Sequence, residues 1–148
     1  MFKHNLKNKK SGFSLLELVL AIAIFSLSSF ALATMLIDSN ISVRLSTERT
    51  EALFYAKEGV EAMRSIRNNN PWAYLTEGDY YLDESGETWT LTSTPNILAD
   101  KYTRVISIED LPDDPNTKNI TVTVGWDINS GRTASVNLET VLTNWQNN

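Results

Sequence analysis

The sequence predicts an α+β fold in which one long helix lies across an antiparallel β-sheet. As far as residue 68, apolar residues either form a continuous run or recur at three- and four-residue steps, as in a helix. Beyond residue 78 they alternate with polar residues, as in strands. The apolar stripe of a helix and the apolar face of a sheet each need a partner, so we expect them to cover one another.

The first helical segment is an apolar run at residues 13–37, in which Glu17 is the only charged side chain. A helix of this length measures about 38 Å, which is enough to cross a hydrocarbon core of about 30 Å. Asp38 follows the run, and four lysines precede it: Lys3, Lys7, Lys9 and Lys10. This charge asymmetry predicts a membrane span with its N-terminus in the cytoplasm and the rest of the chain outside.

Glu17 is out of place in this run, because a carboxylate inside an apolar membrane helix costs about 2.5–3.5 kcal/mol. Such a residue needs a partner. If the chain were cut just before Phe13, a free amine would lie about one helical turn from the Glu17 carboxylate. Neighbouring subunits could then pair amine with acid.

The residues Gly12-Phe13-Ser14-Leu15-Leu16-Glu17 resemble the processing site of type IV prepilins and type II secretion pseudopilins. The resemblance implies that a membrane aspartyl peptidase cuts after Gly12 and methylates the new N-terminus at Phe13. It also implies that Glu17 docks each subunit into a growing filament, and that the fold is pilin-like. Many Gram-negative members close a C-terminal loop with a disulfide, but this chain has no cysteine.

Within that family, the segments 58–67 and 136–145 resemble minor pilins more than a major subunit. We therefore expect a minor pilin or pseudopilin of a type IV pilus, a type II secretion system or a competence filament. The expected partners are other subunits through the N-terminal helix, the prepilin peptidase and methyltransferase, and an inner-membrane assembly platform. The expected location is the cytoplasmic membrane, with the N-terminus inside, followed by a periplasmic or cell-surface filament.

Two other interpretations of the N-terminus stay open. Ala31-Leu32-Ala33 fits the cleavage site of a secretory signal peptide, which would leave a soluble secreted domain, although the apolar run is longer than such a peptide needs. An ordinary membrane anchor explains the length of the run but neither Glu17 nor the Gly12-Phe13 junction. A further alternative for function is an adhesive or substrate-binding module at a filament tip.

The expected domain organisation follows from these boundaries: a basic leader at 1–12, a membrane or filament-core helix at 13–37, and an α+β head at 38–148. Removing the four leader lysines leaves nine basic residues against eighteen acidic ones. The exported part is therefore acidic, and a surface of that sign gains no counterion release from nucleic acid, so we expect no nucleic-acid partner.

The head is expected to begin with an amphipathic helix at 38–68, which Asn68-Asn69-Asn70-Pro71 should end. Its apolar stripe consists of Leu45, Ala52, Ala56, Val60, Met63 and Ile66, while charged residues, Glu48 among them, occupy the positions between. The sheet is expected between residues 78 and 145, with a break at 111–115. Five strands are expected in it: 79–83, 88–92, 102–109, 120–127 and 134–139.

The sequence offers little for catalysis, and we expect no enzyme and no cofactor. His4, in the leader, is the only histidine, and there is no cysteine, which excludes nucleophile–histidine pairs and His/Cys zinc sites from the mature chain. Asp113 and Asp114 are weak candidates for calcium, without the pattern of a dedicated calcium loop. Trp126 is expected in the core, Trp72 at the helix–sheet edge, and Trp145 free to contact a neighbour.

Overall fold

The computed structural model describes residues 14–84, 86, 88–129 and 131–145. The chain divides into two compact units, one ending at Val43 and the other comprising Arg44–Asn148. We refer to these as the N-terminal unit and the C-terminal unit. The element order is α1 (Leu15–Asn69), η1 (Trp72–Tyr74), β1 (Gly78–Asp83), β2 (Thr90–Thr92), β3 (Ile97–Leu98), β4 (Tyr102–Leu111), β5 (Asp114–Asn129) and β6 (Arg132–Thr143).

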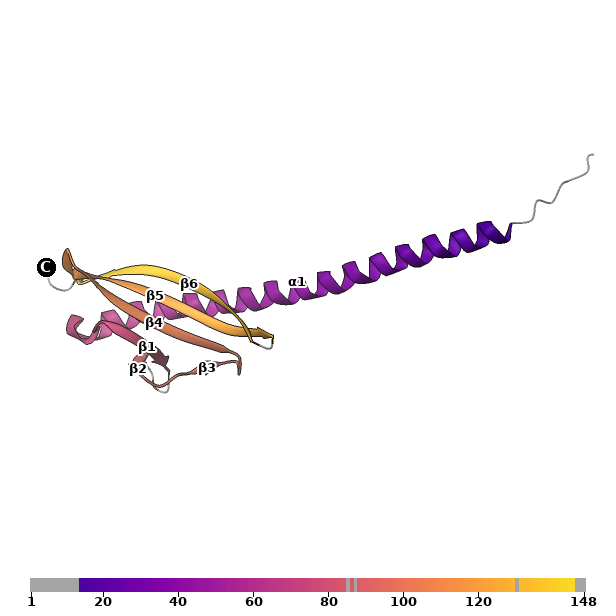
Figure 1. Cartoon of the computed structure of the whole chain (residues 1–148). Coiled ribbons are helices and arrows are strands. Elements are labelled where there is room, and N and C mark those ends of the chain that lie inside the picture. The colour runs from indigo at the N-terminus through magenta and orange to yellow at the C-terminus, as the bar shows by residue number, and fades with distance from the viewer. Residues whose placement is uncertain (1–13, 85, 87, 130, 146–148) are drawn as a thin grey trace, which may run out of the picture. The chain divides into compact units, whose positions relative to one another are not determined.

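The helix α1 is one continuous element of 55 residues, coloured from indigo to magenta in Figure 1. Continuity follows from its composition, because it contains no proline and only one glycine, Gly59. It ends as the sequence predicts: Asn70 donates its backbone and side-chain amides to the carbonyl of Ile66, and Pro71 follows. Proline disfavours the helical conformation at the residue before it, which stops the helix there.

The strands form one antiparallel sheet in the order β2-β1-β4-β5-β6, and β3 pairs with the start of β4. This confirms the α+β class, with a long apolar helix followed by an antiparallel sheet. The expected break at 111–115 is narrower than predicted, since β4 reaches Leu111 and β5 begins at Asp114. Pro115 is accommodated because the β4–β5 register shifts at Asp110 and Leu111, which leaves this part of β5 outside the regular ladder.

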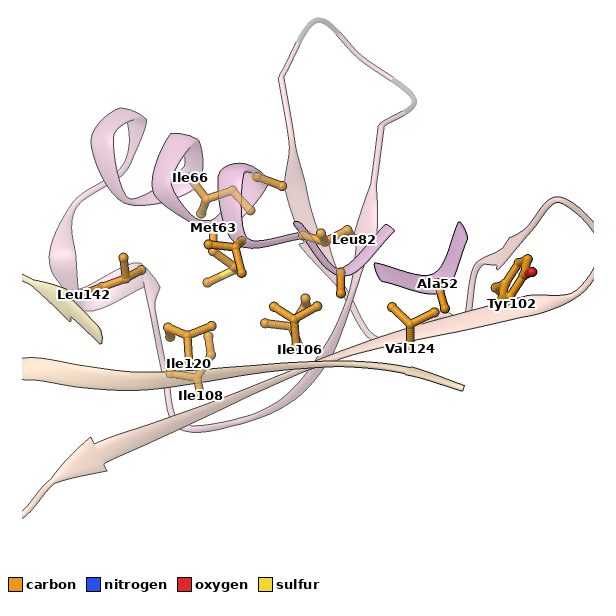
Figure 2. Packing of buried hydrophobic residues seen from close by; sticks show 14 of the residues in the cluster. Ala52, Met63, Ile66, Leu82, Tyr102, Ile106, Ile108, Ile120, Val124 and Leu142 are labelled. Atoms are coloured by element: carbon orange, nitrogen blue, oxygen red, sulfur yellow. The ribbon is translucent and has the colours of Figure 1, made fainter. Parts of the chain in front are cut away.

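The core lies between the C-terminal half of α1 and one face of the sheet (Figure 2). The expected alternation on β5 is confirmed, because its alternate residues are buried: Ile120, Val122, Val124 and Trp126. Alternate residues of β4, small and apolar residues of α1 from Ala52 to Ile66, and Leu75, Leu82 and Leu142 also belong to this core. Met63 and Ile66 on α1 approach Ile106, Ile108 and Ile120 of the sheet from the opposite side.

Several expectations about individual side chains need correction. Glu48, placed among the exposed charges by the sequence, is buried, and so is Arg104. Leu45, placed on the buried stripe, is only half-buried, whereas Gly59 and Ala62 are buried in addition. The physical reason for the charged residues is that each finds partners across the helix–sheet boundary, as described below.

The tryptophans lie as predicted. Trp126 is 6 % exposed in the core, while Trp145 is 57 % exposed. Trp72 packs against the edge of the core and donates its indole N–H to the carbonyl of Pro115 at 3.2 Å. It thereby joins the end of α1 to the start of β5.

Candidate functional site

The sequence motif falls at the start of α1, and the structure describes only its later part. Gly12 and Phe13 lie outside the described residues. Ser14 precedes α1, and its carbonyl accepts the backbone N–H of Leu18 at 3.1 Å, so this first described residue already takes part in helical hydrogen bonding. Glu17 is therefore in the first turn of α1.

Glu17 is exposed, and no hydrogen bond or ion pair joins it to another residue within the part of the chain that the structure describes. The residues around it are apolar on all sides of the helix. The carboxylate is therefore available to a group from outside this helix, and its position near the helix start also favours a negative charge there.

The apolar residues that follow Glu17 are all exposed. Phe25, Leu27 and Phe30 have more than 70 % of their surface accessible, and the most apolar eighteen-residue window holds no buried residue. This segment is long and apolar enough to span a membrane. Exposed apolar surface on this scale is unfavourable in water, so it requires lipid or other apolar helices as its environment.

Three of the segment's hydroxyl side chains are hydrogen-bonded within the helix itself. The hydroxyls of Ser26 and Ser28 donate to the carbonyls of Ile22 and Ile24 at 2.8 Å, and Thr34 donates to Ala31 at 2.8 Å. Such bonds to the preceding turn hide hydroxyl groups from an apolar surrounding. Glu17 is the charged group of this segment, and among the residues that the structure describes it has no ion-pair partner.

A second polar cluster lies in the C-terminal unit around Glu48. Lys101 approaches one carboxylate oxygen at 2.6 Å, and the indole N–H of Trp126 donates to the other at 3.1 Å. The hydrogen bond from Lys101 is the main reason that the pKa of Glu48 is lowered. The buried Tyr102 hydroxyl donates to Glu51 at 2.7 Å, and burial raises the pKa of Tyr102.

Arg104 provides a comparable link from β4 to α1. Its guanidinium donates to the Tyr55 carbonyl at 3.1 Å and to the Glu58 carboxylate at 2.9 Å, and it lies over the ring of Trp89. Both clusters join charged side chains of the sheet to α1. They hold the helix against the sheet and leave no buried side-chain polar atom unpaired among the described residues.

Asp113 and Asp114, the weak calcium candidates, lie in and directly after the turn between β4 and β5. Asp114 accepts the Thr117 hydroxyl at 2.6 Å and the Asn116 backbone N–H at 2.9 Å, and the Thr117 bond is the main reason that its pKa is lowered. Among the described residues, no three His, Cys, Asp or Glu side chains gather as metal ligands would. The geometry therefore gives Asp114 a role in shaping the turn.

The grouping of Glu48, Lys101 and Arg104 at the helix–sheet boundary was not predicted from the sequence. One signal could have identified Glu48: it lies three residues after Leu45 and four before Ala52, so it falls on the helical stripe assigned to the core. The partners on the sheet gave no comparable signal, because their contacts with α1 depend on how the sheet packs.

Comparison with known proteins identifies one similarity, which lies at the N-terminus of the chain. The family model described as the prokaryotic N-terminal methylation motif matches residues 7–33. The match includes Gly12, Phe13 and Glu17 and most of the exposed apolar segment. No curated protein and no solved structure matches the chain.

Proposed function

We propose, from the premise that this chain carries the N-terminal signal of the type IV pilin class, that it is a minor pilin or pseudopilin. Its proposed role is structural: a subunit of a type IV pilus, a type II secretion filament or a competence filament. The observation that carries the proposal is the combination of the methylation motif with a fully exposed apolar helix directly behind it.

In the proposed pathway, the chain first resides in the cytoplasmic membrane with its N-terminus inside and the C-terminal unit outside. The prepilin peptidase removes residues 1–12 and methylates Phe13. The exposed apolar residues of α1 pass from lipid into contact with the same segment of other subunits, so their apolar surface stays out of water throughout. An inner-membrane assembly platform is the proposed partner for this transfer.

Glu17 has a defined task in this proposal. Its carboxylate pairs with the free amine of a neighbouring subunit's Phe13, which offsets the cost of a charge in an apolar surrounding. A binding module at the filament tip is the alternative function for the same helix. The presence of Glu17 favours a subunit that docks beneath others, because the outermost subunit has no amine above it to pair with.

Substitution of Glu17 tests the assembly step. In cells that express the processing and assembly machinery, Glu17→Ala should leave cleavage intact and lower the amount of subunit in sheared filaments several-fold. Asp38→Ala is the matched control, because it removes an acid that follows the apolar run. Wild-type incorporation of Glu17→Ala would refute the pairing of acid and amine.

Substitution of Gly12 tests the processing step separately. Gly12→Val should block cleavage, since the residue before the cut must be small, and the uncleaved chain should remain in the membrane fraction. The measurement is the migration of the chain on a denaturing gel with and without the peptidase. Cleavage of the Gly12→Val variant at the normal site would show that the peptidase does not recognise Gly12.

A further inference from the structure

One side of α1 in the C-terminal unit faces away from the core and carries no charge for more than two turns. Its residues are Ser46, Thr47, Thr50 and Phe54, all of them exposed, and we call this side the outer face of α1. Thr50 and Phe54 are each two residues from the fully buried Ala52, which places them about 200° around the helix from it. The side of an amphipathic helix opposite its core is usually rich in charged residues, so a neutral outer face needs an explanation.

Phe54 is the apolar centre of this face. It is 66 % exposed, although burial of an aromatic side chain is strongly favourable. The ammonium group of Lys57 lies 6.0 Å from the centre of the Phe54 ring, and Glu61 follows on the same side of the helix. The outer face therefore ends at Phe54, and Lys57 leaves most of the ring accessible.

Polar groups on and beside the outer face are engaged within the same chain. The hydroxyl of Thr50 donates to the carbonyl of Ser46 at 2.9 Å, so it is satisfied by its own helix. Of the flanking carboxylates, Glu51 accepts the hydroxyl of Tyr102 at 2.7 Å, and Glu58 accepts a guanidinium from β4 at 2.9 Å. These two carboxylates are therefore occupied and do not compete with an apolar contact at Phe54.

Lipid is not the cover for this face. Arg44, Glu48 and Arg49 lie on the same stretch of α1, and charged side chains are strongly unfavourable inside hydrocarbon. The stretch therefore lies outside the membrane, where another protein surface is the available cover for Phe54. The short side chains of the outer face suit a second helix, because they allow two helix backbones to approach closely.

We propose that the outer face of α1 packs against the same face of a second copy, in a parallel pair of helices. The inference rests on the proposed function, in which the apolar segments of neighbouring copies contact one another. Copies anchored in one membrane with their N-termini on the same side run in the same direction and present this face at the same height. Phe54 then meets Phe54 and Thr50 meets Thr50 in an isologous contact.

Anchoring also supplies the concentration that such a small contact needs. Two copies held in one membrane meet at a much higher effective concentration than two soluble chains, so a weak contact is sufficient to pair them. A soluble partner has no such advantage, and it would have to present an apolar helix face of its own. A second copy already has one, at the height and in the direction required.

Single cysteines report this contact, because the chain has no cysteine of its own. Full-length Thr50→Cys is expressed in a bacterial membrane without prepilin peptidase or assembly machinery, and the membranes are oxidised. Arg49→Cys is the matched control, since it is the neighbouring residue and equally exposed but lies about 100° around the helix. We expect Thr50→Cys to give several-fold more disulfide dimer than Arg49→Cys. Equal or smaller amounts would overturn the proposal.

Substitution of Phe54 tests whether the outer face stabilises the pair beyond what the membrane segment contributes. In the Thr50→Cys chain, Phe54→Ser should reduce the dimer several-fold, and its exposure means that the core is left intact. Val141→Ser is the control, because it removes an apolar side chain of similar exposure, 57 %, from β6 and should change nothing. An undiminished Phe54→Ser dimer would show that the apolar segments alone bring the copies together.

A staggered contact is the competing arrangement, in which the outer face of one copy meets the apolar segment of another. Thr50→Cys and Ser28→Cys chains of different length, expressed together, would then form the mixed dimer in preference to the Thr50→Cys homodimer. That result would overturn pairing at equal height. These tests use the uncleaved chain and leave Gly12 and Glu17 unchanged, so their failure does not affect the tests of processing and assembly.

Discussion

Glu48 shows how a single charged residue can be part of a core. Its side chain is 11 % exposed, and its two carboxylate oxygens accept bonds from Lys101 and Trp126. A buried charge is tolerated only when it is paired and hydrogen-bonded, and here both conditions are met. The residue therefore fixes one position of α1 against the strands β4 and β5.

The pH dependence of stability tests this role. Because the folded-state pKa of Glu48 is lowered, its contribution is fully present above the unfolded-state value, near pH 4.3, and is lost as pH falls through the folded-state pKa. We expect Glu48→Gln to lose about 1.5–3 kcal/mol of unfolding free energy at pH 7. The difference from the wild type should shrink below pH 4.

Thermal unfolding in detergent micelles, followed by tryptophan fluorescence at pH 7 and below pH 4, measures this effect. Glu61→Gln is the control, because it removes an exposed ion pair with Arg64 that should contribute less than about 1 kcal/mol. If the Glu48→Gln variant were as stable as the wild type at pH 7, the charged cluster would make no net contribution to the free energy of unfolding.

At the scale of elements, the distance between α1 and the sheet depends on small residues in the helix. Gly59, Ala52 and Ala56 are buried where α1 meets the strands. A Cβ added to Gly59 would lie 2.8 Å from Cγ1 of Val122 and 3.1 Å from Cδ of Arg104. Val122 is short and fully buried, so it cannot move aside without shifting the helix.

We therefore expect Gly59→Ala to destabilise the protein, although alanine is the better helix former by about 1 kcal/mol. Overpacking of this kind costs about 1–3 kcal/mol, so the net loss should be up to about 2 kcal/mol. Urea unfolding measures it. Gly125→Ala is the control, because its added Cβ would meet only the Ala134 carbonyl at an ordinary 3.8 Å. If the Gly59→Ala variant were more stable than the wild type, the close contact between α1 and the sheet at Gly59 would be refuted.

The elements also show what could be predicted from sequence. The alternation on β5 and the end of α1 at Asn69 and Pro71 follow from local patterns, and the structure confirms both. The full extent of β5 does not, because its first residues are held by pairing with distant partners such as Thr143. The buried charges of Glu48 and Arg104 were missed for the same reason, since their partners lie about fifty residues away or more.

For the candidate site, the sequence and the structure contribute different information. The motif at Gly12, Phe13 and Glu17 is a local pattern, so the sequence alone could predict it. The structure adds that the apolar residues behind Glu17 are exposed around the whole helix.

At the scale of the whole molecule, the two units have different requirements. All residues that are classed as buried lie at or beyond Glu48, in the C-terminal unit, among the residues the structure describes. The N-terminal unit has no core of its own and needs lipid or other helices. The chain thus combines a self-contained α+β unit with a segment that is stable only in an apolar environment.

This division predicts that a fragment comprising residues 44–148 folds without the N-terminal unit. It should be soluble without detergent and unfold in a single cooperative transition, because it retains the entire core. Circular dichroism and urea unfolding measure this. A fragment without a cooperative transition would mean that residues before Arg44 contribute to folding.

The most direct test of the proposed function is the mass of the mature N-terminus. The chain is expressed together with its own prepilin peptidase, purified from the membrane and analysed by mass spectrometry. We expect a mature chain that begins at Phe13 and carries one additional methyl group, as the motif at residues 7–33 predicts. A chain that begins at Thr34, directly after Ala31-Leu32-Ala33, would instead identify an ordinary secreted domain and contradict a role for Glu17 in assembly.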